Sequence, residues 1–206
     1  MDPSAIRSRT VEVWLHDGEH ILVRPVVPED KPVIKEGFDR LSEESRYRRF
    51  MGKKNLTERD LAYLTEMDYV DHFALVAIGR EPRDYQGLGV ARYVRDGTDP
   101  QSAEAAVAVV DEHHGRGIGT LLLAMLGAVA LENGIRRFTG YLLADNRPVI
   151  DMLNNLGARI EFDSAGMSRM TIDLPAQMEE LKETPLYAVL RAVARGDGSV
   201  VSSPER

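Results

Sequence analysis

The feature that most constrains the fold is a valine-rich run followed by alternate glycines and then a strongly apolar segment. The run covers Val107 to Val110, the glycines occupy every second position from Gly115 to Gly119, and the apolar segment begins at Ile118. This order predicts a buried strand, a tight turn and a helix. The first N–H groups of a helix have no partner within it, and the helix dipole is positive at that end. The junction therefore predicts an anion site, and a pyrophosphate is the anion we expect.

The glycine spacing separates this loop from two other phosphate-binding motifs. A Walker A loop requires Lys after its last glycine, whereas Thr120 follows Gly119 here. The dinucleotide fingerprint is Gly-x-Gly-x-x-Gly, and strictly alternate glycines do not match it. A glycine-rich turn without a ligand is the alternative interpretation.

Composition excludes several classes of protein. The chain of 206 residues has no cysteine, so neither a disulfide nor a thiolate nucleophile is expected. The net charge of −7 and the pI of about 5.3 argue against nucleic acid as a partner. The N-terminus does not resemble a signal sequence, and the longest near-apolar run, 118–131, is shorter than the roughly 20 residues that span a bilayer. We expect a cytoplasmic protein without membrane association.

The pattern of apolar residues and turn signals predicts an α/β fold with a mixed sheet and helices on both of its faces. A Thr57–Asp60 capping box and an Asn133–Gly134 C-cap support two of the helix boundaries. The expected strands are 11–15, 21–26, 72–78, 89–95, 103–110, 137–143, 159–162 and 167–174, and the expected helices are 28–41, 43–50, 57–66, 118–133 and 148–156.

Three segments of different character follow from this pattern. Residues 1–175 are expected to form one domain, residues 176–195 a helical extension, and residues 196–206 a disordered polar tail. One face of the extension is apolar, through Leu186, Val189, Leu190 and Val193. Periodicity shows a buried face but not its partner, so this face either packs on the domain or forms a homodimer contact.

The glycine loop resembles the coenzyme A loop of the GNAT acyltransferases, whose pattern is Gln/Arg-x-x-Gly-x-Gly/Ala. His114 stands where that family usually has Gln or Arg. The segment from Leu143 to Pro148, with Leu156-Gly157 after it, is similar to the GNAT segment in which an Asn contacts the pantetheine arm. The resemblance implies the GNAT fold, with a mostly antiparallel mixed sheet, and acetyl-CoA as co-substrate. The implied cofactor-binding residues are Val107, Ala108, Val109, His114, Gly115, Arg116, Gly117, Ile118, Gly119, Thr120 and Asn146.

Within that superfamily the chain is most similar to bacterial protein-lysine acetyltransferases of the Pat type. The similarity lies in the segments 40–50, 70–77 and 103–106, and it covers roughly residues 20–175. It implies acetylation of lysine ε-amines on proteins. Mycobacterial members of the group carry an added cyclic-nucleotide domain, for which we find no corresponding segment, so we expect activity that is independent of cyclic AMP.

Glu104 is the candidate catalytic residue. It stands alone among small apolar residues in an expected central strand, so we expect it to be buried, and a buried carboxylate is costly unless it is paired. An alkylammonium is not nucleophilic until it loses a proton, and a carboxylate beside the thioester can act as the general base. The resemblance assigns that role to this Glu. The structural alternative is an ion pair with Arg92, which lies diagonally across a symmetric hairpin.

Several further assignments stay open in the sequence. Many GNAT enzymes have a Tyr that protonates the leaving thiolate, but Leu153 occupies its position. No metal is expected, because His113 and His114 are adjacent and therefore do not share a face. The acidic residues Glu66, Asp68 and Asp71 either attract a lysine or simply solvate a helix end. A small-molecule amine acceptor and a non-catalytic acyl-CoA sensor are the alternatives to protein-lysine acetylation.

Overall fold

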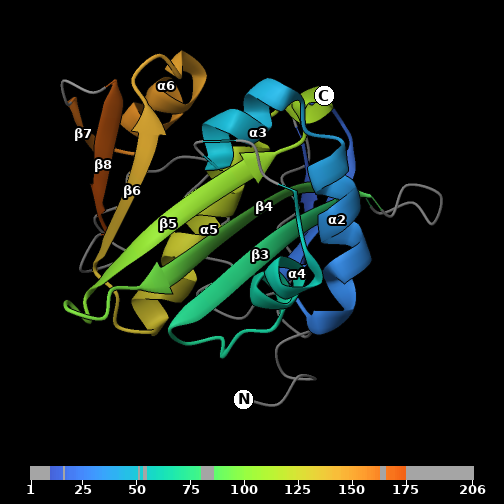
Figure 1. Cartoon of the computed structure of the whole chain (residues 1–206), viewed down its shortest axis with the longest axis horizontal. Coiled ribbons are helices and arrows are strands. Elements are labelled where there is room, and N and C mark those ends of the chain that lie inside the picture. The colour runs from blue at the N-terminus through green and yellow to red at the C-terminus, as the bar shows by residue number, and fades with distance from the viewer. Residues whose placement is uncertain are drawn as a thin grey trace.

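A computed structural model describes residues 10–15, 17–50, 52, 55–79, 86–162 and 166–174, and the expected extension and tail lie outside the described residues. Figure 1 shows its helices and strands. In chain order they are β1 (Val11–Trp14), β2 (His20–Pro25), η1 (Pro28–Asp30), α2 (Lys31–Asp39), α3 (Glu43–Phe50), α4 (Glu58–Thr65), β3 (His72–Gly79), β4 (Gly87–Arg95), β5 (Ser102–Val109), η2 (Asp111–His113), α5 (Ile118–Glu132), β6 (Arg137–Leu143), α6 (Arg147–Asn155), β7 (Arg159–Phe162) and β8 (Met167–Asp173).

The strands form one eight-stranded sheet in the order β1-β2-β3-β4-β5-β6-β8-β7. Every neighbouring pair is antiparallel except β5 and β6, which are parallel. The expected mixed, mostly antiparallel sheet is therefore confirmed. None of the helices in the described ranges is long and apolar enough to cross a membrane.

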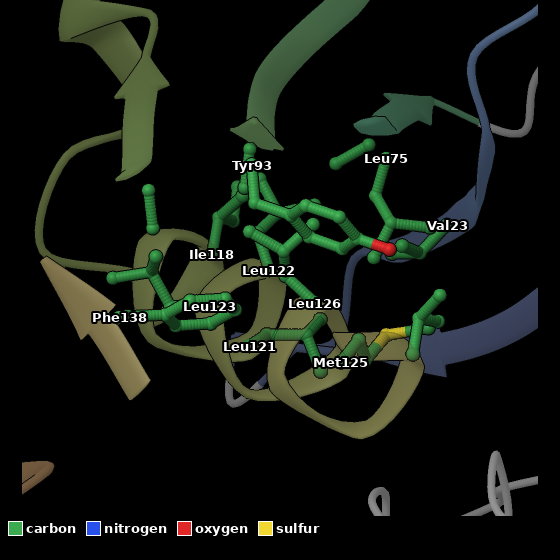
Figure 2. Close-up of a cluster of buried hydrophobic side chains, with 14 of the residues drawn as sticks. Val23, Leu75, Tyr93, Ile118, Leu121, Leu122, Leu123, Met125, Leu126 and Phe138 are labelled. Carbon is green, nitrogen blue, oxygen red and sulfur yellow. The ribbon is translucent and has the colours of Figure 1, made fainter. Parts of the chain in front are cut away.

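Helix α5 forms the main core on one face of the sheet, behind the central strands in Figure 1. It is apolar around most of its circumference, and Leu122 and Leu126 have no exposed surface. A helix of this kind must be enclosed by other elements to be stable in water. The cluster drawn in Figure 2 includes Val23, Leu75, Tyr93, Ile118, Leu122, Leu126 and Phe138.

Helices α2, α3 and α4 cover the opposite face of the sheet (Figure 1). A second apolar cluster lies there, made of strand residues with partly buried residues of α2 packed against them. Helix α3 reaches across to β6. The Thr57 hydroxyl accepts a hydrogen bond from the Asp60 N–H at the start of α4, which confirms the capping box. Helices on both faces are thus confirmed.

Strands β5 and β6 pair over only a short distance and then part. Their register joins Ser102 to Arg137, Ala103 to Phe138 and Glu104 to Thr139. Beyond these pairs the edge of β5 has no partner among the described strands, and Figure 1 shows β5 and β6 diverging. A Cβ at Gly140 would lie 2.9 Å from the Ala105 carbonyl oxygen, so the strands are still close just past the point of parting. An opening therefore lies along β5.

One expected element is wrong in detail. The helix expected over 28–41 is a 3₁₀ turn, Pro28–Asp30, followed by α2, which ends at Asp39. Asp30 is buried, forms two 2.7 Å hydrogen bonds with the Arg24 guanidinium and accepts the Val27 N–H. This network closes a separate turn ahead of the helix. The other boundaries differ from expectation by at most two residues.

Candidate active site

The glycine loop lies between the end of β5 and the start of α5. Gly115 has φ +74° and Gly117 has φ +81°, a left-handed conformation that side chains with a Cβ rarely adopt. Gly117 is the N-cap of α5 and has no side chain to cap the helix. None of the amides from Gly115 to Thr120 donates a hydrogen bond to another described residue. These amides and the positive end of the helix dipole can therefore bind an anion.

The Arg116 side chain is directed to the turn between β1 and β2. Its Nε donates to Asp17 at 2.6 Å, and its guanidinium also pairs with Glu19. The hydrogen bond from Arg116 lowers the pKa of Asp17 to about 2, and the bonds to Asp17 and Glu19 raise the pKa of Arg116. The Arg116 side chain thus connects the loop to the first hairpin. The Arg116 backbone amide is one of the unbonded amides from Gly115 to Thr120, which we call the amide cradle, whereas its guanidinium is occupied elsewhere.

The turn before the glycines is also anchored. Asp111 accepts hydrogen bonds from the Ser42 N–H, the Ser42 hydroxyl and the Ser45 hydroxyl, at 2.7–3.0 Å. Burial raises the pKa of Asp111, but the bonds from Ser42 and Ser45 outweigh it, so the pKa lies below its usual value. His114 Nε2 lies 2.9 Å from the Val109 carbonyl oxygen. The loop is therefore fixed to the start of α3 and to the end of β5.

Asn146 and the glycine loop lie at the same end of the sheet. Asn146 is the N-cap residue of α6 and is 8% exposed, and its side chain makes no capping bond. A Cβ at Gly119 would lie 3.2 Å from Met152 Sδ, so the first turn of α5 packs against the middle of α6. Leu153 of α6 is buried in the main core, as a leucine there should be. Asn146 therefore begins a helix that packs against the start of α5, beyond the end of β6 where that strand has parted from β5.

The segment Val107 to Val109 lines that opening. Its residues are half-buried and, within the described sheet, pair with β4 on one side only, because β6 has already diverged. An unpaired strand edge presents backbone N–H and C=O groups to any extended chain that lies beside it. An elongated ligand can therefore be bonded here like an added strand, with its anionic end at the glycine loop.

Glu104 lies where β5 and β6 part, opposite Val94 of β4 and Thr139 of β6. The expectation that its side chain is buried is wrong, because it is exposed. The apolar neighbours Ala103 and Ala105 face α5 and belong to the main core, whereas Glu104 faces the other side of the sheet. Alternation along the strand, rather than the composition of the run, determines which residues are covered.

The expected diagonal relation between Glu104 and Arg92 is confirmed, because Arg92 pairs with Ala106 and Val94 with Glu104. The expected ion pair is absent from the described part of the chain, where Glu104 has no ion-pair partner. The Arg92 guanidinium instead lies over the Tyr63 ring, 4.6 Å from its centroid, and contacts His72 Nε2. The carboxylate of Glu104 is left open to solvent.

Sequence reasoning missed the side chains that surround Glu104 on this face. Arg49 of α3 interacts electrostatically with Glu104 and Tyr63, and the rings of Tyr63 and His72 lie 5.0 Å apart. Burial and the nearby Arg92 lower the pKa of His72 to about 4. Arg49, Tyr63 and His72 come from α3, α4 and β3. No local spacing relates them, so only the folded sheet brings them together.

The acidic residues considered as a lysine attractor are occupied by contacts within the protein. Glu66 pairs with Lys31, and Asp71 pairs with Arg95. Asp68 accepts the backbone N–H groups of 70–72 at 2.8–2.9 Å. A cavity of about 570 Å³ lies beside Glu66 and Asp68. These carboxylates therefore stabilise the segment 66–72, which follows α4.

The described residues contain no cluster of three or more metal-ligating side chains.

Comparison with known proteins gives consistent matches. A family model described as "Acetyltransferase (GNAT) family" matches residues 43–158. "Acetyltransferase Pat" of Mycolicibacterium smegmatis is 35% identical over 169 residues, which is 80% of this chain and 49% of the relative. The chain thus spans about half the length of that relative. An acetyltransferase of Pseudomonas aeruginosa is 33% identical over 144 residues, or 69% of this chain and 77% of the relative. The crystal structure of the GNAT domain of S. lividans PAT is 30% identical and covers 84% of this chain and 100% of its own, with a TM-score of 0.75.

Proposed function

The chain belongs to the acetyltransferase (GNAT) family, and we propose that it transfers the acetyl group of acetyl-CoA to lysine ε-amines of proteins. The observation that carries this proposal is the opening between β5 and β6, with free amides at one end and the Glu104 carboxylate at the other. The choice of lysine rests on the similarity to Pat-type sequences.

The amides of Gly115 to Thr120 bind the pyrophosphate of acetyl-CoA in this proposal. The left-handed glycines and the absence of bonds from these amides to other described residues support the assignment. The edge from Val107 to Val109 bonds the pantetheine arm, and Asn146 contacts it from the opposite side. An amide on this edge polarises the thioester carbonyl.

Glu104 acts as the general base. Its carboxylate takes a proton from the acceptor ammonium, directly or through one water molecule. The neutral amine nitrogen then forms a bond to the thioester carbonyl carbon, and the carbon–sulfur bond breaks when the sulfur leaves as a thiolate. The nitrogen loses its second proton to solvent, which leaves the neutral amide. The position of Glu104 at the point where the strands part, with its side chain open to solvent, supports this role.

Position 153 of α6 provides no proton for the departing thiolate, because Leu153 is an apolar side chain buried in the core. A thiol has a pKa near 8.5, so its anion leaves far more readily than an alkoxide and solvent can supply the proton. We therefore assign no general acid to this step.

Incubation of the purified protein with labelled acetyl-CoA and a lysate, followed by mass spectrometry, tests the proposal. We expect label on protein lysines, and no label with the Gly117→Val variant, whose loop cannot hold its conformation. Label found only on small amines would replace the lysine acceptor. No transfer to any amine, in a protein that still binds acetyl-CoA, would favour a non-catalytic sensor.

A further inference from the structure

Two arginines that form no ion pair with any described carboxylate flank Glu104 on its face of the sheet. Arg92 projects from β4 opposite Ala106, and Arg49 belongs to α3. Arg92 is only 7% exposed, yet neither arginine forms an ion pair with any described carboxylate. Glu104 interacts electrostatically with both arginines but forms no ion pair with either, so one exposed carboxylate faces two largely buried cations, which is costly. Because burial of these two cations lowers the stability of the fold, their presence beside Glu104 indicates a role in binding.

Apart from the longer-range attraction to Glu104, the direct contacts of Arg92 are with uncharged groups. The Tyr63 ring offers a cation–π contact, and His72 offers a ring nitrogen. Burial lowers the pKa of Arg92 to about 10, and burial also lowers the pKa of Arg49. Arg92 therefore remains cationic at neutral pH, whereas His72, with its pKa of about 4, is uncharged there.

Donor groups of both guanidiniums remain open. Only one nitrogen of Arg92, Nη2, has a hydrogen-bond partner among the described residues, and Arg49 has none there. No nitrogen of Arg49 or Arg92 is among the fully buried side-chain nitrogens and oxygens of the described residues that have no hydrogen-bond partner. The free N–H groups therefore reach solvent. Arg49 also contributes a charged side chain to an otherwise apolar cavity of about 70 Å³, whose lining includes Ala108 and Val90.

We propose that Arg49 and Arg92 form a subsite for a carboxylate on the acceptor, so that the preferred acceptor is an amine with a carboxylate near its nitrogen. The inference rests on the proposed function, since it names the acceptor class of that same site. A guanidinium presents planar, paired donors that match a carboxylate, and it carries its charge at all relevant pH values. In a protein acceptor the carboxylate is an acidic side chain next to the lysine.

The same two charges favour the reactive form of the amine. A nearby cation disfavours a second positive charge, so an acceptor ammonium beside Arg49 and Arg92 loses its proton more readily. A plain alkylammonium would be repelled from such a site. A carboxylate on the acceptor offsets that repulsion, which is why the pair selects for acceptors that carry one.

Matched acceptors that differ by a single charge test the inference. One pair of peptides places Glu or Gln beside a central lysine, and a second pair is Nα-acetyl-lysine and its carboxamide. We expect the wild-type protein to acetylate the carboxylate member with a kcat/KM about tenfold higher or more, as for hydrogen bonds to a charged group. The peptide pair and the small-molecule pair together distinguish a protein acceptor from a free amino acid.

Variants connect that preference to the two arginines. Arg92→Gln and Arg49→Gln should each reduce the preference to below about threefold, while the melting-temperature rise caused by CoA stays near that of the wild type. Arg48→Gln is the matched control, because Arg48 lies on the same helix and pairs with Glu44. If Arg92→Gln does not fold, Arg49→Gln carries the test alone.

Equal kcat/KM values for both members of each pair in the wild-type protein would overturn the inference, and so would a preference that survives in Arg49→Gln. The failure of the proposed function has a different signature. In that case no lysine acceptor of either charge is acetylated, although CoA still raises the melting temperature.

Discussion

Glu104 lies opposite Thr139 in the last residue pair that joins β5 to β6. The strands diverge beyond this pair, and the free edge of β5 then runs from Ala105 to the glycine loop (Figure 1). A carboxylate at the narrow end and unbonded amides at the wide end fit a long ligand with a reactive group at one terminus and an anion at the other. This arrangement is the main structural support for the proposed acetyl transfer.

The amide cradle makes a prediction about cofactor binding. Gly117→Val should abolish the melting-temperature increase that CoA causes, because a β-branched residue cannot hold φ +81° without strain and moves the amides. Gly134→Val is the matched control, since Gly134 has φ +80° at the other end of α5 and an added Cβ there would meet no described atom within 4 Å. Thermal shift assays measure both variants.

Both variants carry similar strain, so both should melt at somewhat lower temperature than the wild-type protein. Only Gly134→Val should keep its response to CoA. A folded Gly117→Val protein that binds CoA with wild-type affinity would show that the pyrophosphate lies elsewhere.

Substitution of Arg116 distinguishes CoA binding by the backbone amides of the loop from CoA binding by the Arg116 side chain. Its guanidinium pairs with Asp17 and Glu19, so Arg116→Gln should reduce CoA affinity by less than about threefold, in line with the small contribution of exposed ion pairs. Isothermal titration calorimetry measures the affinity. A loss of more than about tenfold would indicate that the guanidinium binds phosphate directly.

His72 predicts a specific dependence of stability on pH. Its pKa is lowered to about 4 in the folded protein, mainly by burial, from an ordinary value of 6.5. Between those pH values the unfolded chain binds a proton that the folded protein does not bind, so the free energy of unfolding falls as pH decreases from 6.5 to 4. Urea denaturation at about pH 7 and about pH 5 should show a smaller loss for His72→Gln than for wild type. Equal losses would contradict the burial of a neutral imidazole.

The sequence predicts the scaffold because local signals determine most of it. The apolar run, the alternate glycines and the Thr57 capping box are each confirmed by an element in the expected place. The exposure of Glu104 was not predictable from composition, because alternation along β5 places its side chain on the face of the sheet away from α5. The position of Arg92 beside Glu104 follows from the β4–β5 hairpin, whereas that of Arg49 depends on contacts between α3 and the sheet, which no local spacing encodes.

The central claim is that Glu104 is the base for acetyl transfer. Glu104→Gln keeps the shape of the side chain and removes its ability to accept a proton. Glu161→Gln on β7 is the control for loss of an exposed carboxylate. Glu104 is exposed, forms no ion pair with a described residue and acts on Arg49 and Arg92 only at longer range, so we expect at most a small change in melting temperature for either substitution.

The most direct measurement is the turnover of Glu104→Gln with acetyl-CoA and a lysine peptide, across pH, beside its melting temperature. The account predicts a decrease in kcat of about 100-fold at neutral pH, with CoA binding unchanged. The remaining rate should climb toward the amine's pKa near 10.4, because only amine that is already neutral reacts. A variant that keeps wild-type kcat, or that loses stability instead of activity, would contradict the assignment of Glu104 as the base.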